Sequence, residues 1–212
     1  MQTITEVALH KAVRGVFTRQ EAGCWVDSEG ARLDALLKRA VAAGEILRIR
    51  RGLYCLAKRY LHRQIHPFAL AQRIHGPSYV SMEAALAHHG WIPEAVYAIT
   101  SASMERSRTI ETPLGLFSFA RIPQREFLAG VNRVALEDGN SFFVAGPLKA
   151  LADYVYVHAL DWRSVTPILA SLRVDESELN RLTTASFDRL AAVYGSGRVR
   201  RFLNGLRKDL GK

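Results

Sequence analysis

Residues 27–56, DSEGARLDALLKRAVAAGEILRIRRGLYCL, decide the fold of the N-terminal part of the chain. The apolar side chains of the first half recur at helical spacing, at Leu33, Leu36, Leu37, Ala40 and Val41. Ser28 is expected to cap this helix, because its hydroxyl can accept a hydrogen bond from a free amide of the first turn. Gly44 supplies the C-terminal stop. The stretch therefore begins with a predicted helix between Ser28 and Gly44.

The second half of the stretch predicts a tight β-hairpin with arginines at its tip. Two extended runs, residues 45–50 and 53–56, flank a turn that contains glycine. Leu47 and Ile49 are expected to face a core. The side chains expected to face water are Arg48, Arg50 and Arg51. Three arginines on one ribbon repel one another unless an anion lies opposite them. A helix followed by such a basic hairpin is typical of the DNA-reading half of a winged helix-turn-helix.

The residues upstream complete the order of a winged helix. A first helix is expected from residue 3 to about residue 13, followed by a short extended segment. Thr18 then caps a second helix, with Glu21 as its capping-box partner. The order is helix, short strand, helix, turn, helix and hairpin. We therefore predict a winged helix-turn-helix DNA-binding domain over residues 1–60.

The rest of the chain predicts a second domain, residues 66–212, after a basic connector. Five runs have the composition of strands: residues 97–100, 109–112, 116–122, 132–136 and 141–144. Ser81 is expected to cap one helix and Pro147 to open another. The part that follows Trp162 is helical in pieces. The predicted fold class is α+β, an N-terminal winged helix-turn-helix followed by an α+β domain with a helical C-terminal layer.

Composition favours a polyanionic partner. The chain has 212 residues, a formal net charge of +9 and a pI near 9.9. Residues 1–66 contain twelve Lys and Arg against six Asp and Glu. No apolar run approaches the roughly 20 residues that cross a bilayer, and the N-terminus lacks the apolar segment of a signal peptide. Cys24 and Cys55 lack the spacing of a zinc site, so we expect a cytoplasmic protein with free thiols.

The candidate DNA-binding residues lie on the predicted helix and hairpin. They are Ser28, Arg32, Lys38, Arg39, Arg48, Arg50 and Arg51. A winged helix places the start of its recognition helix in the major groove, which favours Ser28 and Arg32 as base readers. The other basic residues are expected to meet phosphate or the minor groove. The alternative for all the basic residues is a solvated charged face. For the arginines at 198, 200 and 201, a charged helix face is as good a reading as a second binding surface.

The sequence contains no convincing catalytic or metal-binding motif. His62 and His66 are four residues apart, but Pro67 follows and no third ligand is evident. Ser81 lacks the glycines of a nucleophile elbow. The Gly-Ser-Gly at residues 195–197 lacks the paired aspartates of a nucleotidyltransferase. We therefore expect no enzyme activity, no metal and no cofactor.

Five segments together resemble a known family. They are RRGLY (residues 50–54), HPFALAQRIHGPSYVSMEAALAHHG (66–90), YAITSAS (97–103), TPLGLFSF (112–119) and GPLKALAD (146–153). In this order they resemble the AbiEi antitoxins of type IV toxin–antitoxin systems. The resemblance runs from the predicted winged helix to about residue 153.

The resemblance implies a bacterial, two-domain antitoxin and transcriptional autorepressor. The N-terminal domain would bind inverted repeats of double-stranded promoter DNA, and the C-terminal domain would carry the antitoxin activity. The functional partner would be AbiEii, a toxin with a nucleotidyltransferase fold, which the antitoxin counters without forming a stable complex. No membrane is implied.

Two other functions remain open from the residues themselves. The first is a ligand-responsive winged-helix regulator whose α+β domain binds a small molecule, although no convergent polar set can be identified in the strand-rich segment. The second is an enzyme that acts on nucleic acid, which would lack an acidic metal-binding pair.

Overall fold

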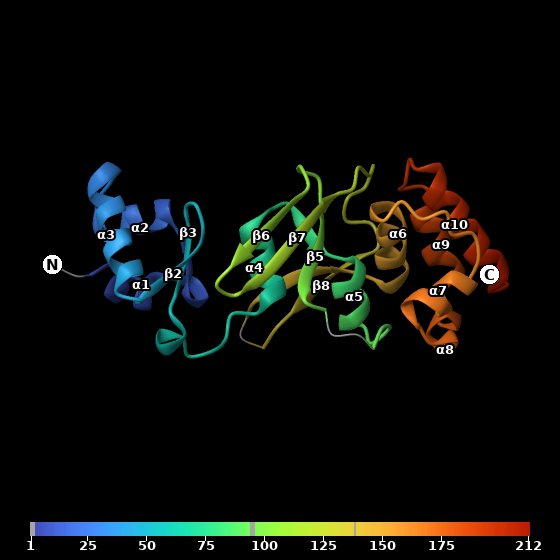
Figure 1. Cartoon of the computed structure of the whole chain (residues 1–212), viewed down its shortest axis with the longest axis horizontal. Helices are drawn as coiled ribbons and strands as arrows, with labels where there is room; N and C mark the ends of the chain where they lie inside the picture. Colours follow the sequence, from blue (N-terminus) through green and yellow to red (C-terminus); the bar gives the residue numbers. More distant parts are fainter. Residues whose placement is uncertain (1–2, 94–95, 138) are drawn as a thin grey trace. The chain divides into compact units, whose positions relative to one another are not determined.

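The computed structural model describes residues 3–93, 96–137 and 139–212. The chain folds into two compact units (Figure 1), residues 1–70 with 110–115, and residues 71–109 with 116–212. The predicted α+β fold class is confirmed. The domain boundaries at residues 60 and 66 stay predictions.

The first unit has the element order of a winged helix. Its elements are α1 (Ile4–Lys11), β1 (Val16–Thr18), α2 (Arg19–Val26), α3 (Gly30–Ala42), β2 (Ile46–Arg50) and β3 (Leu53–Leu56), with single 3-10 turns at Val13–Gly15 and Lys58–Tyr60. The strands form an antiparallel sheet in the order β1-β3-β2. Buried side chains from the helices and the sheet make one apolar core, which includes Phe17, Leu37 and Ile46.

Side-chain caps begin the first two helices. Thr3 and Glu6 form a capping box at α1, and Thr18 and Glu21 form the predicted one at α2. The helix α1 ends at Lys11, two residues before the predicted end, because Ala12 already has an extended backbone.

The expected position of Leu47 in the core is wrong. Leu47 is half-buried, and its neighbour Ile46 is fully buried instead. The register of β2 against β3 shifts between Arg48 and Arg50. A bulge of this kind breaks the two-residue alternation on which the prediction rested. Ile49 is buried, as expected.

The second unit is built on a mixed sheet in the order β6-β7-β5-β4-β9-β8, whose edge strand β6 the unit boundary crosses. The strands are β4 (Ser78–Val80), β5 (Ala98–Ser103), β6 (Arg108–Thr112), β7 (Gly115–Arg121), β8 (Val131–Ala135) and β9 (Ser141–Ala145). Five of them match the predicted runs to within a few residues. The central strand β4 has only three residues, and no strand was predicted there from the sequence. It pairs antiparallel with β5 and parallel with β9.

Helices complete the second unit. They are α4 (Pro67–Ile74), which the unit boundary crosses, α5 (Met82–His88), α6 (Pro147–Val157), α7 (Thr166–Leu172), α8 (Glu176–Asn180), α9 (Thr184–Ala191) and α10 (Gly197–Asp209). The helix α6 packs against α5, β9, α9 and α10. The helices α7 to α10 gather at the C-terminal end (Figure 1), which is the predicted helical layer.

Candidate nucleic-acid interface

A tight turn joins α2 to α3, and the three together form the helix-turn-helix. Asp27 has a left-handed backbone with φ +46°, and the Ser28 amide donates to the Gly23 carbonyl at 3.1 Å. A Cβ on Gly23 would lie 2.9 Å from the Ser28 carbonyl oxygen and 3.1 Å from Leu33 Cδ2. Glycine at position 23 therefore allows the close approach of the turn to α2.

Ser28 does not cap α3, so that expectation is wrong. The helix begins at Gly30, and Glu29 occupies the N-cap position without a side-chain hydrogen bond. The helix α2 continues to Val26, so Ser28 is part of the turn that follows, and its amide closes that turn. The Ser28 hydroxyl is buried and has no hydrogen-bond partner among the residues that the structure describes.

The amphipathic character of α3 leaves its basic residues outside the core. Leu33, Leu37 and Ala40 are buried. Three predicted site residues of this helix are exposed: Arg32, Lys38 and Arg39. On the hairpin the exposed side chains are those of Arg48, Arg50 and Arg51.

A hollow of about 620 Å³ lies between α3 and the hairpin. Its lining includes Lys38 of α3 and Arg48 and Arg51 of the hairpin, which are separated in sequence. The fold thus brings together three of the predicted DNA-binding residues. Leu37 and Tyr54 form part of its wall.

A second hollow lies between α2 and α3. It is lined in part by Ser28 and Arg32, the two residues expected to read bases, and by Cys24. Arg39 and Arg50 line neither hollow. The Arg50 side chain folds back on the turn, where its Nη1 donates to the Arg51 carbonyl at 3.0 Å.

Arg19, which was not among the predicted site residues, lines both hollows. Its backbone amide donates to the Gly52 carbonyl of the hairpin turn at 2.9 Å. Its side chain donates from Nε to Asp34 Oδ1 at 2.7 Å and from Nη2 to the Gly30 carbonyl at 3.1 Å. One residue therefore connects α2, α3 and the hairpin. Its partners are eleven or more positions away, so no local sequence pattern identifies it.

The Arg19–Asp34 pair affects the protonation of both groups. The hydrogen bond from Arg19 is the main cause of the lowered pKa of Asp34, and the positive charge of Arg51 adds to it. The same hydrogen bond raises the pKa of Arg19. At neutral pH the hollow between α3 and the hairpin therefore has one ionised carboxylate, Asp34, among the cations of its described lining.

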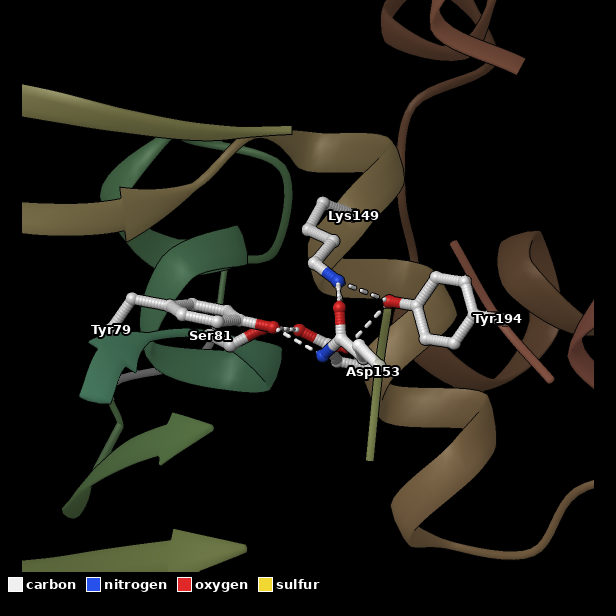
Figure 2. A network of polar contacts seen from close by, with 6 residues as sticks. Tyr79, Ser81, Lys149, Asp153 and Tyr194 are labelled. Atoms are coloured by element: carbon white, nitrogen blue, oxygen red, sulfur yellow. Dashed lines mark hydrogen bonds and ion pairs between the residues drawn. The ribbon is translucent and has the colours of Figure 1, made fainter. Parts of the chain in front are cut away.

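The second unit contains a buried polar cluster centred on Asp153 of α6 (Figure 2). Asp153 Oδ2 accepts from the Tyr79 hydroxyl at 2.9 Å and from Ser81 Oγ at 2.6 Å. Asp153 Oδ1 accepts from the Tyr194 hydroxyl at 2.5 Å and lies 3.6 Å from Lys149 Nζ. The Asp153 and Lys149 side chains are 0% and 1% exposed.

Lys149 is also hydrogen-bonded. Its amine donates to Gln124 Oε1 and, at 2.9 Å, to the Tyr194 hydroxyl. The amide of Gln124 donates to the Tyr79 hydroxyl at 2.8 Å. Burial lowers the pKa of Lys149, against the raising effect of Asp153. Burial raises the pKa of Tyr79 and of Tyr194 well above their ordinary value.

Ser81 therefore has a different role from the expected cap. It occupies the N-cap position of α5, but its hydroxyl bonds Asp153. Thr100 of β5 replaces it, since Thr100 Oγ1 accepts from the Ala84 amide at 3.0 Å. The sequence signal for the cluster is the Lys-Asp pair four residues apart inside the apolar helix PLKALADYVYV. A serine, a lysine and an aspartate resemble a catalytic set, but all three are buried and the carboxylate is saturated by hydroxyl donors, so the cluster is structural.

The described residues contain no group of three His, Cys, Asp or Glu side chains that could hold a metal ion. In the same part of the chain, no helix has the length and apolar character needed to span a bilayer.

The helix-turn-helix and the hairpin give the first unit the architecture of a winged helix, with a basic hollow between α3 and the hairpin. Residues 6–57 match the family model of the transcriptional regulators described as AbiEi antitoxins. The resemblance predicted from sequence is therefore confirmed over residues 6–57. No curated protein matches the chain.

Proposed function

We propose that this protein binds inverted repeats of double-stranded DNA in its own promoter and represses transcription. The observation that supports this proposal most strongly is the hollow between α3 and the hairpin, where Lys38, Arg48 and Arg51 converge. Convergent cations on a winged helix suit the phosphates of a duplex whose major groove receives α3. Arg32, near the start of α3, is the proposed base reader.

The double variant Arg48→Ala/Arg51→Ala tests the proposal. Duplex affinity depends on salt through the counterions that each phosphate contact releases. Loss of two contacts is expected to weaken binding at low salt and to reduce the slope of log affinity against log salt by about 1.8. The measurement is a fluorescence anisotropy titration of the full chain with promoter DNA at several salt concentrations.

A matched control removes two exposed arginines from the second unit, Arg163→Ala/Arg181→Ala. Both arginines form surface ion pairs with carboxylates, at 2.6 and 2.7 Å. This control is expected to keep the affinity and the salt slope of the natural chain. Equal binding by the Arg48/Arg51 variant and the control would contradict the assignment of the hairpin.

We further propose that the protein is the antitoxin of a type IV system and counters a nucleotidyltransferase-fold toxin without a stable complex. The match of residues 6–57 to antitoxin regulators supports this part. Co-expression with the product of the neighbouring gene is expected to restore growth, while the two proteins do not co-purify. Continued growth arrest in the presence of soluble antitoxin would contradict the proposal.

A further inference from the structure

A carboxylate lies on the surface proposed to meet DNA. Asp34 is the one acidic residue among the described residues that line the hollow between α3 and the hairpin; the basic ones are Arg19, Lys38, Arg48 and Arg51. A negative charge in this place opposes phosphate binding. A role in recognising bases, rather than in binding phosphate, would explain why a carboxylate lies here.

Asp34 keeps hydrogen-bonding capacity toward an incoming ligand. Its side chain is 60% exposed. Oδ1 accepts from Arg19 Nε, whereas Oδ2 accepts no hydrogen bond from any residue that the structure describes. An ionised carboxylate accepts hydrogen bonds and cannot donate them. The free oxygen can therefore bind a donor and repels an acceptor.

The position of Asp34 on α3 suits contact with a base edge. It lies in the second turn of the helix, close to the end that a winged helix presents to the major groove. Its neighbours Ala31 and Ala35 are exposed. Their short side chains let the helix backbone approach the bases closely, which brings a short aspartate side chain within reach.

Of the four bases, one presents a major-groove edge that suits an ionised carboxylate. Guanine presents two acceptors, and thymine presents an acceptor and a methyl group. Adenine has an amino donor, but its N7 acceptor lies beside it and repels the carboxylate. Cytosine presents the N4 amino group as a donor without an adjacent N7.

We propose that Asp34 is a specificity-determining residue that selects cytosine by accepting a hydrogen bond from its N4 amino group, and that its charge weakens binding to DNA of unrelated sequence. The inference rests on the proposed DNA-binding function. Arg19 occupies Oδ1 and leaves Oδ2 free for the base. The charges of Arg19 and Arg51 offset the repulsion between the Asp34 carboxylate and the DNA phosphates.

Selection from a library of randomised duplexes tests the inference, with the full-length chain and sequencing of the bound DNA. The natural chain is expected to enrich a motif that contains a cytosine. Asp34→Ala should lower the preference for this cytosine about tenfold, which corresponds to about 1.4 kcal/mol. Asp34→Asn should shift the preference to adenine, because a carboxamide both accepts from N6 and donates to N7.

Two further variants separate this role from simpler ones. Asp188→Asn removes a carboxylate that is also 2.7 Å from an arginine, in the second unit, and is expected to leave the motif unchanged. Arg19→Ala is expected to weaken binding to all duplexes and keep the cytosine. If Asp34 serves only to hold Arg19, Arg19→Ala will lose the same base preference as Asp34→Ala, and this overturns the inference.

The remaining outcomes are also decisive. Against a duplex that lacks the motif, Asp34→Ala is expected to bind severalfold more tightly than the natural chain. An unchanged motif for both Asp34 variants, or a base other than cytosine at the affected position, overturns the inference and leaves the proposed function intact. If the natural chain enriches no motif and binds no duplex, the proposed function fails as well. Circular dichroism of each variant shows that the fold is retained.

Discussion

Lys149 is an amine inside the second unit, and its charge is balanced by one carboxylate. It lies 3.6 Å from Asp153 and donates to the Tyr194 hydroxyl. Moving both charges out of water costs several kcal/mol for each, so the pair is weak evidence for net stability. Removing only one of the two groups is costly, however, because the remaining group is then buried without a counter-charge.

Lys149→Met tests this dependence. The variant leaves Asp153 buried without its cation, and we expect a loss of about 3–5 kcal/mol in the free energy of unfolding of the second unit. Urea titration followed by the fluorescence of Trp91 and Trp162 measures it. Lys208→Met, at an exposed position, should change stability by less than about 0.5 kcal/mol.

A double variant separates charge from packing. Lys149→Met/Asp153→Asn removes both charges, and its cost is expected to be smaller than the sum of the two single costs. A loss for the double variant that equals the sum would show that the two groups act independently.

The raised pKa values of the two tyrosines in the cluster lead us to expect a loss of stability at alkaline pH. Tyr79 and Tyr194 have a pKa raised well above their ordinary value of 10.0, mainly through burial and then through the charge of Asp153. A group whose pKa is higher in the folded state than in the unfolded state makes its full contribution to the stability of the fold at pH values below its unfolded-state pKa. That contribution falls as the pH rises above about 10 toward the folded pKa. The lowered pKa of Lys149 acts in the opposite direction below 10.5 and offsets part of the loss.

Urea titrations of the natural chain and of Tyr194→Phe between pH 8 and pH 11 measure this effect. The variant loses a hydrogen bond and is expected to be less stable at pH 8, with a flatter decline above pH 10. An equally steep decline in both proteins would exclude Tyr194 as a source of the alkaline effect.

Among the elements, the turn between α2 and α3 leaves little space for a side chain at position 23. Gly23→Ala would place a Cβ 2.9 Å from the Ser28 carbonyl oxygen, which is a backbone atom. We expect the turn to shift, with a loss of about 1–3 kcal/mol in stability and weaker promoter binding, since the turn fixes the angle of α3. Thermal unfolding and anisotropy titration measure the two effects.

Gly195→Ala is the matched control, because nothing lies within 4 Å of the added Cβ. The same substitution there should leave promoter binding unchanged. Equal promoter affinity of Gly23→Ala and the natural chain would show that the turn tolerates the extra carbon.

At the scale of the whole molecule, the two compact units suggest a division of labour. Residues 67–212 contain all six strands of the mixed sheet and the buried polar cluster. We expect residues 67–212, which keep the whole of α4, to fold alone and to protect cells from the toxin. The same fragment should fail to repress, because it lacks α3 and the hairpin.

Growth beside the toxin and promoter output, measured separately, test both halves of this prediction. Circular dichroism of the purified fragment is the control for folding. A folded, soluble fragment that gives no protection would contradict the separation, and repression by the fragment would contradict the role of the winged helix.

The sequence alone determined the local elements of this protein. Helical spacing from Leu33 to Val41, the Thr18–Glu21 capping box and the glycine-containing hairpin turn are short-range patterns, and each predicted the element that forms. The buried face of an amphipathic helix follows from the spacing of its apolar residues, so the exposed arginines of α3 could also be predicted.

Only the tertiary structure decided which distant residues meet. Arg19 meets Asp34 and Gly52, and Tyr79, Lys149 and Asp153 meet in one buried cluster. Two predictions were wrong by one residue for the same reason. Glu29, not Ser28, occupies the N-cap position of α3, and Ile46, not Leu47, is fully buried in the core. A turn and a bulge each shift the chain by a residue or two, and they do so in response to packing against other elements, which no local pattern records.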